Sequence, residues 1–332
     1  MNTRYGFISV DCDTIRDYLS VYHLNHTAAQ PGQKTIDAVY QKGIPRFLEL
    51  FARHGIKATF FIIGKDLENE YHLQIARRII QEGHEIGNHT FNHPPQFRQF
   101  SASEKRKEVE QTDRLVQDLL GVKMVGFRAP GYEIDETILK ILAENGYRYD
   151  CSVLPSFIFP LAKMMVHLKS RQARKTKRFF SLLRDFGPWA VAPRQPYLPD
   201  EDALWKEMSV EPGKRNGHPK VLEIPITVVP GVNLPFYGTL LLSAGMPYYR
   251  FAFSLIKRST RVLSFEYHAV ELVSLLEDGV DPRLKVHPGL GLALRQKQSM
   301  IDQALRDMKT HFHLLKGEDL AGKIIQECGY PS

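Results

Sequence analysis

The 332-residue sequence has little cysteine and no long apolar run. Its three cysteines are odd in number, widely spaced and outside any paired ligand pattern, which argues against a disulfide framework or a cysteine-based zinc site. No window of about eighteen consecutive apolar residues occurs, so we expect no transmembrane helix. The N-terminus has no apolar segment with a small-residue cleavage site, so we expect no secretion signal. These absences favour a globular protein of a reducing compartment, the cytoplasm.

Acidic residues are absent from one strongly basic segment, residues 156–184. It contains eight lysines and arginines, whereas the whole chain has a net charge of +7, so the rest of the chain is close to neutral. Apolar residues flank the basic ones, and a basic amphipathic segment of this kind can lie on an anionic membrane surface. This pattern favours peripheral contact with the inner face of the membrane, although a solvated helix face or contact with an acidic glycan are alternatives. No recognised nucleic-acid motif accompanies the segment, so nucleic acid is not an expected partner.

Strand and helix patterns alternate regularly through the first half of the chain. β-Branched and aromatic residues at 5–10 predict a buried strand, and apolar residues at helical spacing predict a helix over 44–54 that ends at Gly55. A Ser-x-x-Glu pattern, with Ser103 as the capping residue, predicts the start of a long helix that ends at Gly121. Further strands are expected at 56–64, 84–90, 124–132 and 147–153, and further helices at 72–83 and 135–146. This alternation predicts a mostly parallel sheet, and its repetition favours a barrel.

The alternation stops at about residues 156–220, where basic, proline-rich and polar stretches follow one another. We interpret this part as an insertion that contains a basic helical segment. Strand patterns return at 221–229 and 261–270, and residues 293–328 have a helical pattern. The predicted fold is therefore an α/β, distorted (β/α) barrel over residues 1–280, with a C-terminal helical extension, residues 281–332, packed on the barrel.

Polar residues that could take part in catalysis or metal binding stand at the ends of the predicted strands. Asp11 and Asp13 are two residues apart, so their side chains share one face if the strand continues regularly. His89 and His93 are four apart, a spacing that places two imidazoles on one side of a helical turn and lets both reach one cation. Taken singly, the aspartates also fit a turn or a helix cap, and the histidines also fit a structural role.

Two further strand ends carry residues of the same kind. Arg128 begins the sequence RAPG, where an arginine can hold a carboxylate and a following backbone N–H can face an oxyanion. His268 ends a strongly apolar strand, at the position where a barrel presents its active-site residues. A plain loop around Arg128 and a core histidine at 268 are the alternative interpretations.

Together these stretches resemble the polysaccharide deacetylase family, also called the NodB homology domain or carbohydrate esterase family four. The similar stretches occur in the family's order, over about residues 5–155 and 220–275, and the most specific is the His-x-x-x-His element. They are SVDCDT, KATFFIIG, HEIGNHTFNH, GFRAPGY, YRYDCS and FEYH. The resemblance implies a distorted (β/α) barrel and a metal-dependent amidohydrolase.

The resemblance also implies a role for each matching residue. Asp13, His89 and His93 would bind a divalent metal ion, with Zn²⁺ favoured and other transition metals open. Asp11 would be the general base, and Arg128 would hold its carboxylate in place. The backbone N–H of Gly131 would donate to the oxyanion. His268 would be the general acid, and the carboxylate of Asp150 would orient it. Such a set meets the needs of amide hydrolysis, because the cation activates water and an acid protonates the poor leaving amine.

The sequence departs from the family's commonest pattern at two places. Cys12 separates two aspartates that are usually adjacent, as in a subset with an Asp-x-Asp-Thr pattern, so the division of roles between Asp11 and Asp13 stays open. The tryptophan often found after the fourth motif is absent, which leaves the acyl pocket undefined.

The expected substrate is an amino sugar that carries an N-acetyl or N-formyl group. The chain resembles both deformylases of lipid-linked formamido-arabinose and deacetylases of bacterial polysaccharide or glycolipid synthesis, and the basic segment 156–184 favours a lipid-linked substrate. A deacetylase of a polysaccharide or peptidoglycan-type glycan is the alternative. Two further alternatives are a catalytically inactive sugar-binding or membrane-surface scaffold and a hydrolase of cyclic ureides or amides. The oligomeric state is open.

Overall fold

A computed structural model describes residues 3–22, 33–158, 191–200, 203–208 and 221–329. Within these ranges, eight strands form one sheet. Seven follow the order β10-β1-β2-β3-β4-β5-β8, and the eighth, β9, pairs with the whole length of β1. All of these pairs are parallel. The strands are β1 (Tyr5–Asp11), β2 (Thr59–Ile62), β3 (Glu85–Asn88), β4 (Gly126–Phe127), β5 (Tyr149–Asp150), β8 (Leu222–Glu223), β9 (Val262–His268) and β10 (His313–Leu315).

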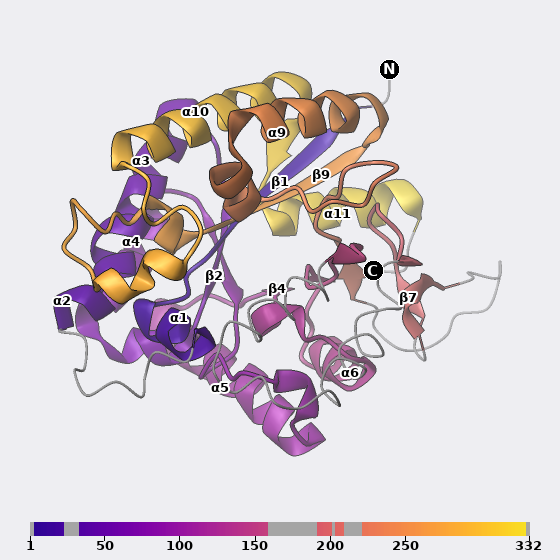
Figure 1. Ribbon diagram of the computed structural model, residues 1–332. Coiled ribbons are helices and arrows are strands. Elements are labelled where there is room, and N and C mark those ends of the chain that lie inside the picture. Colours follow the sequence, from indigo (N-terminus) through magenta and orange to yellow (C-terminus); the bar gives the residue numbers. More distant parts are fainter. Residues whose placement is uncertain (1–2, 23–32, 159–190, 201–202, 209–220, 330–332) are drawn as a thin grey trace, which may run out of the picture.

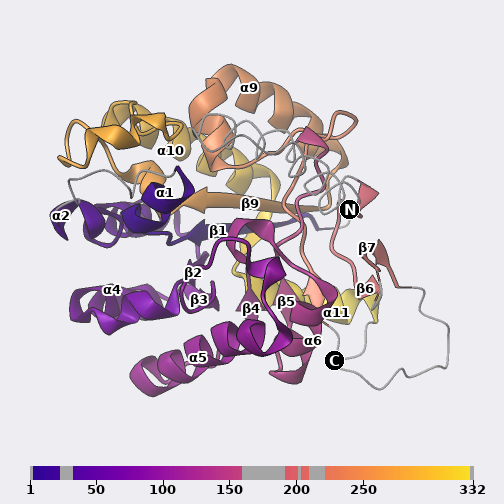
Figure 2. The same ribbon diagram turned by 60° about the horizontal axis from the view of Figure 1, so that its bottom comes forward.

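The two ends of this sheet approach each other just beyond β8. The backbone N–H of Thr227 donates to the carbonyl of Ser264 on β9 over 3.1 Å, and the N–H of Ser264 donates to the Thr227 hydroxyl over 2.8 Å. The sheet therefore curls into a half-barrel, and helices cover its outer side (Figures 1 and 2). The predicted distorted (β/α) barrel is confirmed in this form.

The helices begin and end where the local sequence favours it. Helix α3 ends at Gly55, whose φ of 61° is left-handed, and α6 begins after Asp135, whose carboxylate accepts the N–H of Ile138. The helices are α1 (Ile15–Val21), α2 (Gln33–Ile36), α3 (Ile44–His54), α4 (Glu70–Gln81), α5 (Ala102–Leu120), α6 (Glu136–Glu144), α9 (Gly238–Ser259), α10 (Leu294–His311) and α11 (Gly317–Cys328). Short helical turns are η1 (Val39–Gly43), η2 (Gly64–Glu68), η3 (Phe97–Gln99), η4 (Pro130–Tyr132), η6 (Ala269–Leu272) and η7 (Pro282–Val286).

Three details differ from the sequence predictions. The cap of α5 is Ser101 rather than Ser103, because the capping box needs a Glu three residues later and Ser101 has it in Glu104. The segment 293–328 is not wholly helical, since β10 interrupts it and pairs with β1 through Tyr5–Phe7. Helix α9 was not predicted from the sequence. It contains Gly245 in a non-helical conformation, followed by Pro247, and these residues interrupt the helical pattern.

The predicted insertion falls largely outside the described residues, and so does most of its basic segment. Of the part that is described, β6 (Pro199–Asp200) and β7 (Ala203–Glu207) form a separate antiparallel pair. No helix in the described part of the chain is long and apolar enough to cross a membrane.

A buried carboxyl group fastens the C-terminal helix α11 to the sheet. Glu85 on β3 accepts hydrogen bonds from the hydroxyl of Thr59 (2.6 Å), the hydroxyl of Tyr149 (2.9 Å) and the backbone N–H of Glu318 (3.0 Å). Burial raises the pKa of Glu85 to about 7, although all three hydrogen bonds oppose the shift. The carboxyl is therefore favoured in its protonated form in the folded protein.

We predict that Glu85 makes the stability of the protein depend on pH. Because its pKa is higher in the folded than in the unfolded state, its contribution is complete at about pH 4 and is lost as the pH rises through about 7. Relative to Glu85→Gln, the wild type should lose about 2–3 kcal/mol of unfolding free energy between about pH 4.5 and 8. Urea denaturation of both proteins across this range measures the difference, and a difference that does not change with pH would contradict the prediction.

Candidate metal centre

The site is built from the carboxyl ends of neighbouring parallel strands. Asp11 is the last residue of β1 and His268 the last residue of β9, and the two are direct partners in the strand register. His89 follows β3, and Arg128 follows β4. Because carboxyl ends of parallel strands meet on one side of a barrel, residues far apart in the sequence converge there.

Asp13, His89 and His93 form a compact cluster at this side. Asp13 Oδ1 lies 3.1 Å from His89 Nε2 and 3.4 Å from His93 Nε2, and one ligand atom from each residue lies within 4.8 Å of the other two. His89 Nδ1 is 2.8 Å from the carbonyl oxygen of Arg128, so this nitrogen donates, and Nε2 would be the ligand atom when a cation is bound. One carboxylate and two neutral imidazoles are a common ligand set for Zn²⁺, and this cluster fits such a cation.

The local backbone around the two histidines differs from the predicted helical turn. Residues 89–93 form an irregular loop, in which Thr90 (φ 66°) and His93 (φ 50°) adopt left-handed conformations. The prediction of a helical turn was therefore wrong, although the imidazoles still meet, with ring centroids 4.9 Å apart. Non-glycine residues adopt such conformations rarely, and they cluster at functional sites.

Glu108 on α5 holds this loop in place. Its Oε2 accepts the backbone N–H groups of Phe91 (3.0 Å) and Asn92 (2.8 Å), and its Oε1 accepts the side-chain amide of Asn92 (2.7 Å). The sequence analysis missed Glu108, because a glutamate at a helical position gives no signal of a loop that lies elsewhere in the chain.

Cys12 explains how the separated aspartates reach the same site. Its side chain is fully buried in the hydrophobic core, so the alternation of side chains continues past the end of β1. Asp11 and Asp13 consequently face the site on either side of a core residue. Of the two, Asp13 is the closer to the histidines, because Asp11 Oδ2 lies 3.8 Å from His89 Nε2.

Arg128 holds Asp11 from within the protein. Its guanidinium is fully buried and donates to Asp11 Oδ1 over 2.7 Å and to the carbonyl of Cys151 over 3.1 Å. It also lies over the Phe61 ring, 4.7 Å from the centroid. A buried cation is costly unless it is paired, so the contact between Arg128 and Asp11 fixes both side chains.

His268 lies between two buried glutamates that the sequence analysis did not identify. Its Nε2 is 3.4 Å from Glu266 Oε1, and its Nδ1 is 3.8 Å from Glu271 Oε1. Burial favours the neutral ring, but the neighbouring carboxylates, led by Glu271 and Glu266, outweigh it and raise the pKa of His268 to about 10. The ring is thus favoured as a proton donor at neutral pH.

The other two predicted site residues have different surroundings. Gly131 lies in η4 with φ 57°, and its role as an oxyanion donor stays a prediction. Asp150 accepts a hydrogen bond from the Ser152 hydroxyl over 2.6 Å and lies opposite Glu223 on β8. Burial raises the pKa of both Asp150 and Glu223, which favours a shared proton between them. The orienting of His268 by Asp150 likewise stays a prediction.

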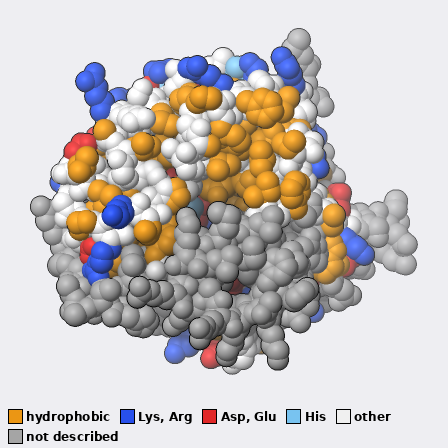
Figure 3. Space-filling model, in the orientation of Figure 1, with side chains coloured by type: hydrophobic (Ala, Val, Ile, Leu, Met, Phe, Trp, Pro, Cys, Tyr) orange, Lys and Arg blue, Asp and Glu red, His pale blue; other side chains and the backbone are white. Residues whose placement is uncertain are grey.

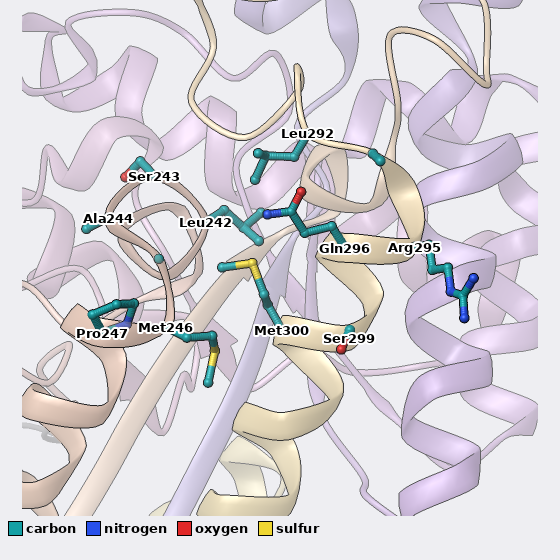
Figure 4. A pocket seen from close by; sticks show the side chains of 12 residues that line it. Leu242, Ser243, Ala244, Met246, Pro247, Leu292, Arg295, Gln296, Ser299 and Met300 are labelled. Carbon is teal, nitrogen blue, oxygen red and sulfur yellow. The ribbon is translucent and has the colours of Figure 1, made fainter.

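A separate groove of about 730 Å³ lies between the interrupted part of α9 and the start of α10. Figure 4 shows Leu242, Gln296 and Met300 pointing toward one another, whereas Arg295 points away from them. Helix α9, which lines one side of the groove, also contacts the surroundings of His268, because the Thr239 hydroxyl donates to Glu271 Oε1 over 2.6 Å.

Part of the chain matches a known protein family. Residues 31–149 match the family model described as polysaccharide deacetylase. A peptidoglycan-N-acetylglucosamine deacetylase of Bacillus cereus is 35% identical over 103 residues, which are 31% of this chain and 36% of that protein. The chain matches about a third of the length of the first curated relatives.

Two solved structures share the fold. One is a Mycobacterium smegmatis protein assigned to the polysaccharide deacetylases, with a TM-score of 0.58 and 15% identity over 98% of this chain and 92% of that chain. The other is the PuuE allantoinase, with a TM-score of 0.57 and 14% identity over the same shares of the two chains. Since these names differ, the fold alone does not select the reaction.

We predict that His89→Ala and His93→Ala each lower the affinity for zinc by more than about 100-fold, the upper range for loss of an outer-shell partner. Each variant removes one imidazole of the three-residue cluster. The zinc content after dialysis against buffered zinc measures the effect. His311→Ala is the matched control, because His311 is exposed on α10 and should leave the zinc content unchanged. A zinc content equal to that of the wild type in both His89→Ala and His93→Ala would show that the metal ligands lie elsewhere.

Proposed function

We propose that the chain, of which residues 31–149 match the polysaccharide deacetylase family model, is a metal-dependent hydrolase that removes an N-acyl group from an amino sugar. The observation that carries this proposal is the position of the Asp13–His89–His93 cluster, with Asp11 on one side of it and His268 nearby. Metal-dependent amide hydrolysis needs a set of metal ligands, a general base and a general acid in one place. This arrangement contains all three.

The proposed ligands are Asp13, His89 and His93. When bound, a divalent cation would lower the pKa of water and polarise the acyl carbonyl. Asp13 supplies the negative charge of the set, and the hydrogen bond of His89 Nδ1 to a backbone carbonyl keeps its Nε2 available as a ligand atom. Zn²⁺ is the ion that this donor set favours.

Proton movement is assigned to Asp11 and His268. Asp11 accepts the proton of the attacking water, and Arg128 orients the carboxylate through the 2.7 Å contact. His268 then donates its proton to the nitrogen of the leaving amine, which is a poor leaving group without it. The strand register places these two residues side by side on β1 and β9. The Gly131 N–H is the proposed donor to the developing oxyanion.

We predict that Asp11→Asn keeps the bound metal and lowers kcat by about 10²–10⁴-fold, the usual contribution of a general base. The amide keeps the shape of the side chain but cannot accept a proton from water. Release of acetate or formate from N-acyl amino sugars measures kcat, and zinc content with thermal unfolding verifies the folded, loaded protein. Wild-type turnover in this variant would assign the base to another residue, and no turnover by the wild type would favour an inactive sugar-binding scaffold.

Two substrate classes follow from the same chemistry. The names of the relatives favour a polymeric glycan such as peptidoglycan, for which an N-acetyl group is the expected acyl group. The groove beside α9 favours the narrower proposal of a lipid-linked amino sugar, either acetylated or formylated. Apolar residues line much of the groove, and hydrophobic side chains gather over α9 on the face shown in Figure 3. Leu242 lies three residues after Thr239, about 4.5 Å along the helix, so a hydrocarbon chain in the groove would start close to Glu271 and His268.

We predict that Met246→Gln in the groove lowers kcat/KM for a lipid-linked amino sugar by about 10-fold and leaves hydrolysis of a soluble glycan fragment unchanged. Leu255→Gln is the matched control, because Leu255 is a half-buried residue of the same helix outside the groove. Mass spectrometry scores the loss of acetate against the loss of formate from both substrates. Equal effects on the two substrates would favour the polymeric glycan and leave the groove without a role in catalysis.

A further inference from the structure

Glu266 occupies the middle of the site. It lies within the stretch FEYH, but the resemblance gives it no role and the Asp13–His89–His93 cluster does not include it. It lies on β9 two residues before His268, so both side chains point to the same face of the strand. Its side chain is fully buried, and its register partner on β1 is Ser9. A buried carboxylate in such a position needs partners that compensate its charge.

One oxygen of Glu266 faces the arginine that holds the general base. Glu266 Oε2 lies 3.1 Å from Arg128 Nη1, the same nitrogen that donates to Asp11 over 2.7 Å. The guanidinium therefore lies between two carboxylates, one from β1 and one from β9. Removing Glu266 would leave Asp11 as the remaining carboxylate in contact with Arg128 among the described residues.

The other oxygen of Glu266 faces the acid side of the site. Its Oε1 accepts the Tyr132 hydroxyl over 2.7 Å and lies 3.4 Å from His268 Nε2. Tyr132 belongs to η4, directly after Gly131, so this contact also reaches the turn that carries the proposed oxyanion donor. One carboxylate thus contacts the holder of the base, the acid and the oxyanion turn.

We propose that Glu266 is a positioning residue that joins the two proton-transfer groups: it fixes Arg128 behind Asp11, and it keeps His268 protonated and oriented toward the leaving nitrogen. The proposal rests on the proposed function of the site. It gives Glu266 the part that the family resemblance assigned to Asp150, whose own partners are Ser152 and Glu223. Asp11, Glu266 and His268 also lie close enough together to bind a cation. The Arg128 guanidinium already supplies positive charge there, so one metal ion per chain is expected.

Several charged or titratable groups surround His268, so the effect of Glu266 must be separated from theirs. Asp11 ends β1 and Asp13 lies two residues beyond it. Glu271 lies in η6 and Tyr18 in α1, while His287 follows η7. Glu271 stays in place in every variant below. A change that follows the loss of Glu266 alone therefore reports the contact between Glu266 and His268.

The first experiment compares two leaving groups in the zinc-loaded full chain. An N-acetyl amino sugar leaves as an amine and needs a proton, whereas 4-nitrophenyl acetate leaves as a stable phenolate and does not. Glu266→Gln should lower kcat for the amide by about 10²-fold, with KM little changed, and lower hydrolysis of the ester by less than about 3-fold. Tyr132→Phe, which removes one hydrogen bond to Glu266, should have the same selectivity with a smaller loss. Ser264→Ala, on the same face of β9, is the control expected to match the wild type, because its hydroxyl has no hydrogen-bond partner within the described ranges.

The second experiment measures the His268 proton directly. Removal of an opposite charge within about 4–6 Å lowers a histidine pKa by about 1–3 units, so the alkaline limb of kcat should move to lower pH in Glu266→Gln. A histidine NMR titration of the same zinc-loaded proteins should show the same decrease for His268, and it does so without any turnover.

Three results would overturn the proposal. The first is an unchanged His268 titration in Glu266→Gln, and the second is a selective loss of amide hydrolysis in Asp150→Asn but not in Glu266→Gln. The third is two zinc ions per wild-type chain, one of them lost in Glu266→Gln. If the wild type hydrolyses no N-acyl amino sugar, the proposed function fails, whereas the NMR titration still decides the role of Glu266. If Glu266→Gln unfolds, Tyr132→Phe carries the same comparison.

Discussion

The buried guanidinium of Arg128 is the group on which the geometry of the site depends. It contacts the last residue of β1, the carbonyl of Cys151 just after β5, and Glu266 on β9, while its own backbone carbonyl orients His89 after β3. The cost of burying a cation is offset only while these partners are present. The strands that surround Arg128 are therefore tied to one arrangement of their carboxyl ends, and the positions of the base, the acid and one metal ligand follow from it.

Much of this arrangement was predictable because it follows from strand ends. A run such as residues 5–10 predicts a strand from local composition, and the rule for parallel barrels then places the residue that follows it in the site. That reasoning, with the order of the motifs, led to Asp11, Asp13, Arg128 and His268. The helix over 44–54 was equally readable, because its apolar spacing and its terminal glycine are local signals.

The features that were missed depend on contacts between distant parts of the chain. The loop at His89 contains two left-handed residues, and it is held by Glu108 on α5, which accepts the backbone N–H groups of Phe91 and Asn92. Strand β10 is three residues long inside a helical pattern, and its pairing with β1 decides its conformation. Glu266 lies in the stretch FEYH but received no role from the sequence, since the role of a glutamate inside an apolar strand becomes evident only once Arg128 and His268 are found beside it.

The balance of charge at the site explains why these distant contacts matter to the chemistry. Four carboxylates lie at the site, and two cationic groups, Arg128 and His268, contact them. The carboxylates are Asp11, Asp13, Glu266 and Glu271. With all four ionised and the imidazoles of His89 and His93 neutral, as metal ligation requires, the group carries a deficit of about two positive charges in a buried setting, where an uncompensated charge is costly. A divalent cation between Asp13 and the two imidazoles would remove this deficit, so the same carboxylates that hold the proton-transfer groups also favour a metal ion.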